Sequence, residues 1–293
     1  MPIELDDERL AAWALPTDVG DKHDRGTVLV IGGSSATVGA ALLAGIAALR
    51  MGAGRLQLAV DEEVATQLAI AVPESMVIGL PQHRDGSLRP GRSIERLAPL
   101  LGSADAVLFG PGLGLRRVAR LLRGVVEQAG PDTGVVLDAA ALAAAAAVGP
   151  AALAPLRGRL ALTPNRDELA ILAESVDAPA GDTGEVAREY GAVVTCFSDI
   201  AAPDGRCWTS PPGGPTLATS GSGDVLAGLV AGAAARSADV PRATCWATFV
   251  HAVAARHAAR HRGTVSVIAR DLLDAAAHVL HDIEQARSSS ADG

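Results

Sequence analysis

Short apolar segments and longer helix-like segments follow one another over most of this chain. Seven segments predict β-strands: Thr27–Ile31, Leu56–Val60, Met76–Leu80, Asp105–Phe109, Gly134–Asp138, Arg159–Thr163 and Ala192–Cys196. Several of them are apolar at nearly every position instead of alternating with polar residues. This pattern is typical of strands that are covered on both faces, as in a parallel sheet.

Segments with helical periodicity lie between these strands: Gly39–Met51, Glu62–Val72, Arg116–Gln128, Ala139–Val148 and Asp167–Glu174. The regular βα order predicts the α/β fold class, with a mostly parallel central sheet and helices on both faces. The last third of the chain differs, because two short strands precede three successive helices. Those strands are predicted near Asp199–Ala202 and Arg206–Trp208, and the helices at Val225–Arg236, Arg242–Arg260 and Ala269–Ala286.

The chain contains no internal repeat and no linker that would divide it. We expect an N-terminal arm at residues 1–20, one catalytic domain at residues 21–287 and a flexible tail at residues 288–293. The first residues are acidic and lack a long apolar run, so we expect no signal peptide. No apolar stretch of the sequence reaches the length that a membrane-spanning helix needs.

Composition narrows the class of partner. Hydrophobic residues make up 49% of the chain but aromatic residues only 2%, so the core has to be built from Ala, Val, Leu and Ile. The formal net charge is -8 and there is no basic tract, so we expect no nucleic-acid partner. The acidic balance does not exclude a phosphate ligand, because backbone N–H groups bind phosphate without Lys or Arg.

The chain has three cysteines, Cys196, Cys207 and Cys245. Their number and spacing fit neither a disulfide framework nor a zinc site, which predicts reduced thiols in a cytoplasmic protein.

A glycine-rich turn carries the sharpest chemical signal. Gly221, Ser222 and Gly223 stand immediately before an apolar helical segment, where successive backbone N–H groups meet the positive end of the helix dipole. Two glycines let an anion approach the backbone closely, so the turn predicts an anion hole for a phosphoryl group in transfer. The neighbouring Asp224 is placed to accept a proton from a substrate hydroxyl. The alternative for Asp224 is a helix N-cap.

The segment Thr219–Ala231 resembles the signature of ribokinase-like enzymes, and most closely that of the ADP/ATP-dependent NAD(P)H-hydrate dehydratases. Five further segments agree with that family in the same order: His23–Gly33, Val38–Gly54, Gly110–Gly114, Asp138–Leu142 and Leu162–Glu168. The resemblance covers about residues 20–285. It implies a ribokinase-like three-layer α/β/α sandwich with a mostly parallel central sheet.

The family resemblance also implies a reaction. ADP or ATP phosphorylates the hydroxyl group of a hydrated nicotinamide ring, and phosphate then leaves to restore NADH or NADPH. By this resemblance Asp224 is the catalytic base and a substrate contact, Gly223 contacts the nucleotide phosphate, and Ala40 and Gly112 line the hydrate pocket. The resemblance further implies Mg²⁺, a homo-oligomer that is a tetramer, and functional pairing with an NAD(P)H-hydrate epimerase.

Three segments depart from the family pattern, and in one of them, Pro212–Leu217, Gly214 stands where the family usually has Asn. Asn165, predicted to contact substrate, stands where the family usually has His, and with Glu168 it forms the N-x-x-E motif of the wider superfamily. In that motif Glu168 holds magnesium through water, and the alternative is an acid that stabilises a helix start. Cys196, Phe197 and Ser198 occupy a predicted nucleotide-binding loop in which the family carries a Lys/Arg-Gly pair. We therefore expect a weaker phosphate contact there.

Two other functions stay open on the sequence. The first is a kinase of the same fold that acts on a vitamin-type alcohol, which the Asn165–Glu168 motif favours. The second is a non-catalytic nucleotide-binding member of the family, which the altered loop at Cys196–Phe197 favours. A dehydrogenase of the Rossmann type is disfavoured because G-x-G-x-x-G is absent.

Three weaker candidates have plain structural alternatives. Asp138 ends an apolar strand and either binds substrate or caps the following helix. His251, His257 and His261 lie on one helical segment, and a solvated basic face is favoured over a metal site. Ser222 is not a hydrolase nucleophile, because its surroundings do not match G-x-S-x-G.

Overall fold

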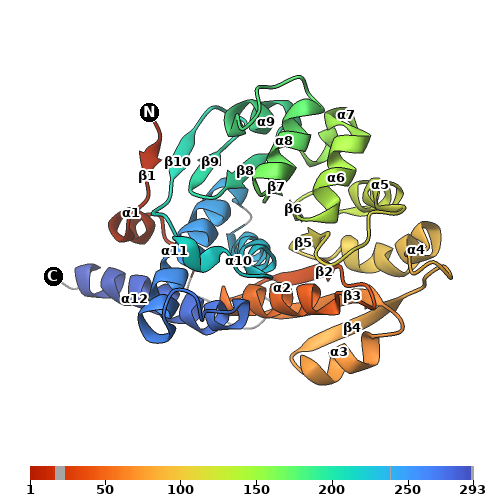
Figure 1. Cartoon of the computed structure of the whole chain (residues 1–293), viewed down its shortest axis with the longest axis horizontal. Helices are drawn as coiled ribbons and strands as arrows, with labels where there is room; N and C mark the ends of the chain where they lie inside the picture. Colours follow the sequence, from red (N-terminus) through yellow and green to blue (C-terminus); the bar gives the residue numbers. More distant parts are fainter. Residues whose placement is uncertain (17–23, 238, 292–293) are drawn as a thin grey trace.

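The computed structural model describes residues 1–16, 24–237 and 239–291. Its ten strands form one sheet in the order β1-β10-β9-β8-β7-β6-β5-β2-β3-β4 (Figure 1). The pairings are parallel except those of β9, which runs antiparallel to both β8 and β10. The predicted α/β class with a mostly parallel sheet is therefore confirmed.

The strands are β1 Ile3–Glu4, β2 Thr27–Ile31, β3 Arg55–Asp61, β4 Ser75–Leu80, β5 Ala106–Phe109, β6 Gly134–Leu137, β7 Leu160–Leu162, β8 Val193–Cys196, β9 Asp199–Ala201 and β10 Cys207–Thr209. The helices are α1 Asp7–Ala12, α2 Val38–Arg50, α3 Ala65–Ala71, α4 Pro90–Leu101, α5 Val118–Gln128, α6 Ala140–Val148, α7 Pro150–Leu153, α8 Arg166–Glu174, α9 Thr183–Tyr190, α10 Ser222–Ser237, α11 Val240–Arg262 and α12 Ala269–Ala291. Two 3₁₀ turns, Ala154–Leu156 and Pro215–Leu217, complete the described elements.

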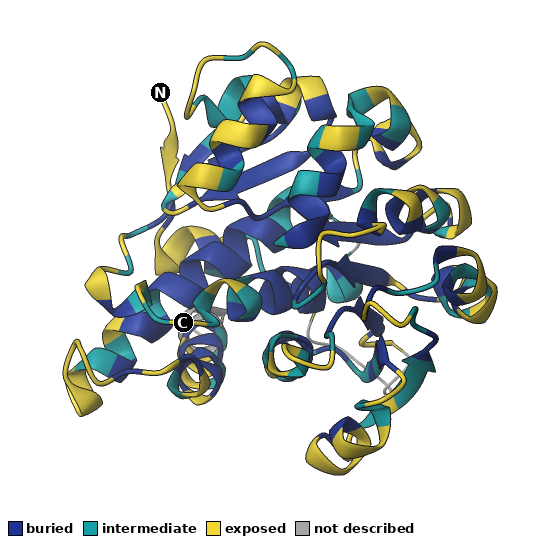
Figure 2. Ribbon diagram, turned by 45° about the vertical axis from the view of Figure 1, so that its right-hand side comes forward, coloured by how far each residue is buried: buried dark blue, intermediate teal, exposed yellow. Residues whose placement is uncertain are grey.

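The sheet is covered on both faces, which explains why its strands are apolar at nearly every position. Val28 and Val30 of β2 pack in one cluster with α2, α10, α11 and α12, whereas Leu29 and Ile31 pack in another with α4, α5, α6, α8 and α9. Figure 2 shows the inner strands buried between helices whose outer faces are exposed, whereas the edge strands β1 and β4 are exposed or only partly buried. The result is the three-layer α/β/α sandwich that the family resemblance implied.

Close backbone contact joins α2 and α10. A Cβ atom at Gly228 would lie 2.8 Å from the Cα atom of Ala44, and one at Gly232 would lie 2.9 Å from that of Ala48. The small residues at these positions therefore let the two helices approach each other. This contact fixes the N-terminal turn of α10 relative to α2, and both helix starts border the candidate site described below.

The predicted N-terminal arm packs onto the domain. β1 pairs with β10 in parallel, and Leu5, Leu10 and Leu15 are buried. Residues 17–20 of this arm and residues 21–23, which include the first residue of the His23–Gly33 segment, lie outside the described residues. The same holds for residues 292–293 of the predicted tail.

Several boundaries differ from the predictions. α12 continues beyond Ala286 to Ala291, so its helix extends into the predicted tail. α10 begins at Ser222 and not at Val225, so its first turn includes the glycine-rich turn. Helices α1, α4, α7 and α9 were not predicted. α4 buries Ser93, Leu97 and Leu101 at helical spacing, but Pro90 and Pro99 suggest a break in the helical pattern there. α1, α7 and α9 are short, at six, four and eight residues, so each presents little pattern. No helix among the described residues is long and apolar enough to cross a membrane.

Candidate active site

The candidate site lies where the strand order reverses. After β2 the chain adds β3 and β4 on one side of it, and then β5, β6, β7 and β8 on its other side. The strand order therefore reverses at the boundary between β2 and β5. Ligands of open α/β sheets bind outside the carboxyl ends of the strands at such a point. Here those ends carry Gly32–Gly33 after β2 and Gly110–Gly114 after β5.

Ala40 and Gly112 are brought together at this boundary. The carbonyl of Gly112 accepts hydrogen bonds from the Ser34 N–H (2.8 Å) and the Thr37 hydroxyl (2.7 Å). A Cβ atom at Gly112, where φ is +67°, would lie 3.0 Å from the Cβ of Ala40. The two residues predicted to line the hydrate pocket are thus neighbours, and a side chain at position 112 would collide with the Thr37 carbonyl.

The glycine-rich turn has the features of an anion hole. Gly221 has φ +89° and packs against Leu43 of α2 and Ala269 of α12, so a larger residue does not fit there. A Cβ atom at Gly223 would meet nothing within 4 Å, so this position borders open space. Within the described chain, the backbone N–H groups of residues 221, 223 and 224 donate to no protein acceptor. The Ser222 hydroxyl donates to the carbonyl of Leu217 (2.7 Å), which holds the turn in place.

Asp224 lies inside the first turn of α10 and is partly buried. The N-cap alternative is wrong, because the helix already begins at Ser222. Burial raises the pKa of the Asp224 carboxyl to about 6. No hydrogen bond to this carboxylate is present among the described residues, so both oxygens are available to a substrate proton.

Asp138 adds a second carboxyl group to the site. It follows β6, is 5% exposed, and accepts a hydrogen bond from the Thr163 hydroxyl (2.8 Å). Burial, followed by the negative charges of Asp224 and Glu168, raises its pKa to about 7. The alternative of a helix cap is wrong, since Ala139 is the N-cap of α6 and no side chain caps that helix.

Asn165 and Glu168 form a reciprocal capping box at the start of α8. The Asn165 side chain accepts from the N–H groups of Asp167 (2.9 Å) and Glu168 (3.0 Å), while Glu168 accepts from the Asn165 N–H (2.9 Å). The helix-start interpretation of Glu168 is therefore confirmed. The negative charge of Glu168 nevertheless contributes to the raised pKa of Asp138, so Glu168 lies beside the site. Magnesium ligation by Glu168 stays a prediction.

The predicted nucleotide loop is a tight hairpin. Cys196 pairs with Asp199, so only Phe197 and Ser198 form the turn between β8 and β9. Cys196 packs in the hydrophobic core. Burial raises the pKa of its thiol to about 11, so the thiol is neutral near neutral pH. Phe197 has φ +55°, is 63% exposed, and carries the Arg166 guanidinium 4.8 Å from its ring centroid. The Ser198 carbonyl accepts from the Ser210 N–H (2.8 Å).

Sequence reasoning missed two side chains near the site. Arg166 places a cation over Phe197, which no spacing rule would indicate, because the residues lie on different elements. His251 is 6% exposed and not solvated, which corrects the interpretation of His251, His257 and His261 as one solvated face. Burial lowers the His251 pKa to about 4, and a backbone hydrogen bond with Ser222 partly offsets this.

The other two histidines join a different cluster. The rings of His257 and His261 lie 4.9 Å apart, and His278 of α12 stacks on His257 at 5.8 Å. Among the described residues, no group of three or more His, Cys, Asp or Glu side chains is arranged to hold a metal ion.

Comparison with known proteins agrees with this geometry. The profile of the NAD(P)H-hydrate dehydratase family matches residues 28–278. An ADP-dependent (S)-NAD(P)H-hydrate dehydratase from Xanthomonas campestris pv. campestris is 42% identical over 272 residues, which cover 90% of this chain and 91% of that protein. The bifunctional NAD(P)H-hydrate repair enzyme Nnr of Moorella thermoacetica is 36% identical over 94% of this chain, which spans 54% of that longer protein.

Solved structures give the same result. The ADP/ATP-dependent NAD(P)H-hydrate dehydratase from Bacillus subtilis, co-crystallized with ATP/Mg²⁺, is 25% identical with a TM-score of 0.76, over 97% of this chain and 99% of that one. A ribokinase-like superfamily protein from Enterococcus faecalis has a TM-score of 0.80 at 22% identity, covering 97% of this chain and 96% of that one, which supports the fold alone. Sequence, fold and site geometry together place the chain in the NAD(P)H-hydrate dehydratase family.

Proposed function

We propose that this protein dehydrates hydrated NADH and NADPH at the expense of ADP or ATP. The observation that carries the proposal is the set of unpaired N–H groups at residues 221, 223 and 224 next to the partly buried Asp224 carboxylate. An anion hole beside a base is the arrangement that phosphoryl transfer to a hydroxyl group requires. The similarity to the dehydratases from Xanthomonas campestris and Bacillus subtilis supports this choice of reaction.

Asp224 accepts the proton of the ring hydroxyl while that oxygen attacks the terminal phosphorus of the nucleotide. The N–H groups of residues 221, 223 and 224 donate to the phosphoryl oxygens and stabilise their negative charge. Phosphate then leaves with the oxygen of the hydrate, and loss of a proton from the adjacent ring carbon restores the dihydronicotinamide. Phosphorylation serves this step because phosphate is a far better leaving group than hydroxide.

The residues present fit a magnesium ion that arrives with the nucleotide. Glu168 has a carboxylate oxygen outside the capping box, and the charges of Asp224 and Glu168 raise the pKa of Asp138, so these carboxyl groups lie in one region. Mg²⁺ usually keeps several waters and takes one or two carboxylates plus phosphate oxygens, so a full protein cage is not needed. When bound, the ion neutralises phosphate charge during transfer.

The test compares Asp224→Asn with the wild-type protein and with Glu174→Gln, an exposed carboxylate of α8. Mixing NADHX, ADP or ATP, and magnesium with the wild type should restore the absorbance of NADH. Asp224→Asn should lower the rate by about 100-fold or more, since general base catalysis supplies a factor of that size, while Glu174→Gln should match the wild type. Unchanged turnover by Asp224→Asn would contradict the assigned base, and release of a stable phosphorylated alcohol would favour the vitamin-type kinase.

The cellular context is proposed on the same basis. The bifunctional relatives support functional pairing with an NAD(P)H-hydrate epimerase. A cytoplasmic location agrees with three unpaired cysteines and with the intracellular occurrence of the nucleotide substrates. A homo-oligomer, with a tetramer as the expected form, rests on the family resemblance, and its test is the mass in solution.

A further inference from the structure

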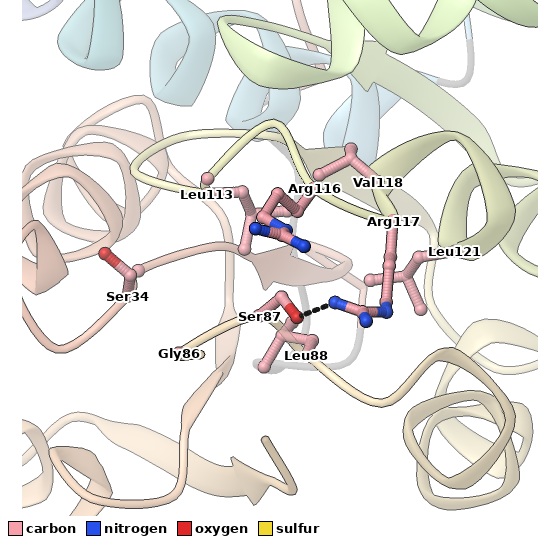
Figure 3. Close-up of a pocket in the computed structure, with 11 residues that line it drawn as sticks. Ser34, Gly86, Ser87, Leu88, Leu113, Arg116, Arg117, Val118 and Leu121 are labelled. Carbon is pink, nitrogen blue, oxygen red and sulfur yellow. Dashed lines mark hydrogen bonds between the residues drawn. The ribbon is translucent and has the colours of Figure 1, made fainter. Parts of the chain in front are cut away.

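A cavity beside the candidate site is not used by the mechanism above. It has an empty volume of about 360 Å³ and lies between the loops that follow β2 and β5, the turn at residues 83–87 and the start of α5 (Figure 3). Its lining includes Gly33, Leu113 and Gly114, which adjoin Gly112 in space or in the chain. The cavity therefore lies beside the residues predicted to line the hydrate pocket.

The cavity is positively charged. Arg116 and Arg117 line it, and no acidic side chain belongs to its lining. The nearest carboxylate is that of Asp85, which lies 3.0 Å from Arg117 and 3.4 Å from Arg116. Hydrogen bonds from Ser87 and Arg117 hold the pKa of Asp85 well below its usual range. Two guanidinium groups and one carboxylate leave one net positive charge at the cavity.

The two arginines have different environments. Arg117 donates to the Ser87 hydroxyl (2.5 Å) and to Asp85, and it keeps a left-handed φ of +64°, so the protein fixes it in one position. The Arg116 side chain is 73% exposed, and only its Nε contacts Asp85 among the described residues. Its two terminal nitrogens are therefore available, and a guanidinium group can bind a phosphate with two parallel hydrogen bonds.

We infer that this cavity binds the phosphate groups of the dinucleotide substrate, with the exposed Arg116 as the phosphate contact and Arg117 as the fixed wall. This inference rests on the proposed function, which places the hydrated ring at Gly112 and Asp224. The remainder of the substrate is anionic, because it carries a diphosphate and, in NADPHX, a further 2′-phosphate. The first turn of α5 adds backbone N–H groups that no side chain caps.

Calorimetric titration with NADH, NADPH and ADP tests the inference without any turnover. The Arg116→Ala variant should bind NADPH, NADH or both about 10-fold more weakly, as expected for one lost charge-assisted contact. Arg116→Lys should recover part of the loss, and ADP binding should stay unchanged. Arg120→Ala, on the exposed surface of the same helix and outside the cavity, serves as the matched control.

The pattern of losses identifies the group that is bound. A loss for NADPH alone indicates the 2′-phosphate, and an equal loss for both dinucleotides indicates the diphosphate. Equal dinucleotide affinity of Arg116→Ala and the wild type would overturn the inference, as would a loss confined to ADP. If Arg116 controls dinucleotide affinity but NADHX is never converted, the proposed function fails and the cavity assignment stands.

Discussion

Asp224 and Asp138 are two carboxyl groups whose pKa values burial raises to different extents. Asp224, partly buried, has a pKa of about 6, whereas Asp138, fully buried and facing the charges of Asp224 and Glu168, has one of about 7. Near neutral pH Asp224 is therefore mostly ionised while Asp138 keeps much of its proton. The negative charge of Asp224 adds to the effect of burial on the pKa of Asp138. This division suits Asp224 to accept a proton.

The raised pKa of Asp224 predicts the pH dependence of activity. A base works only when it is ionised, so kcat/KM should fall as the pH drops through about 6. An ordinary aspartate would instead retain activity to about pH 4. Initial rates with NADHX between pH 5 and 8, at saturating nucleotide, measure the midpoint. A kcat/KM that stays at its maximum down to pH 5, in a protein whose circular dichroism is unchanged over that range, would contradict the burial of the catalytic carboxylate.

Replacing Asp138 by Asn should stabilise the fold at alkaline pH. The folded protein raises this pKa, so burial of the charged form destabilises it above about pH 7, and the penalty vanishes as the pH falls toward the unfolded value of about 4. Asn can still accept the hydrogen bond from Thr163. We expect Asp138→Asn to gain about 1–3 kcal/mol at pH 8 and almost nothing at pH 4. Urea titrations at both pH values provide the measurement, and a variant less stable than wild type at pH 8 would contradict it.

Residue types and spacing predicted only part of the site. The glycine-rich turn and Asp224 are contiguous, so their geometry follows from local rules for helix starts. The raised pKa of Asp138 depends on charges from α8 and α10, and the Arg166–Phe197 contact joins α8 to the β8–β9 hairpin. Such contacts depend on how distant elements pack against each other. Residue types and spacing in a single sequence do not reveal which distant elements meet. The burial of His251 was missed for the same reason.

At the scale of elements, hydrophobic pattern predicted most of the strands and the long helices. β2 occurs with the predicted bounds, and α8 ends at the predicted Glu174. The prediction missed α4 because Pro90 and Pro99 suggest a break, although its buried residues recur at helical spacing. It missed α9 and β1 because they are short, at eight and two residues. These elements depend on tertiary packing for their stability.

The contact between α2 and α10 gives a prediction at this scale. Ala is the better helix former, but a methyl group at Gly228 would overlap the backbone of Ala44. We expect Gly228→Ala to lose about 1–3 kcal/mol of unfolding free energy through overpacking. Gly91→Ala on α4, where a Cβ meets nothing within 4 Å, is the matched control and should be neutral or gain up to about 1 kcal/mol. Equal stability of the two variants in urea would show that α2 and α10 can separate without cost.

For the whole molecule, the N-terminal segment closes one edge of the sheet. β1 covers β10, Trp13 stacks on Trp208 with ring centroids 6.1 Å apart, and the Trp13 carbonyl accepts from Trp246 (2.9 Å) and Arg242 (3.0 Å) of α11. This segment and its partners lie about 200 residues apart in the chain, so it links the edge of the sheet to the helical layer. An uncovered edge strand offers unpaired N–H and C=O groups to other chains.

Deletion of residues 1–16 should therefore destabilise the protein and promote self-association. Leu5, Leu10 and Leu15 leave the core, and each buried leucine contributes about 1.5–3 kcal/mol. Light scattering during thermal unfolding should show a lower Tm and earlier aggregation than in the full chain. Trp13→Phe, which keeps the backbone carbonyl and the aromatic ring, should lose much less stability than the deletion. A truncated protein with the Tm and the mass in solution of the full chain would contradict this assignment, since the edge at β10 would then need no cover.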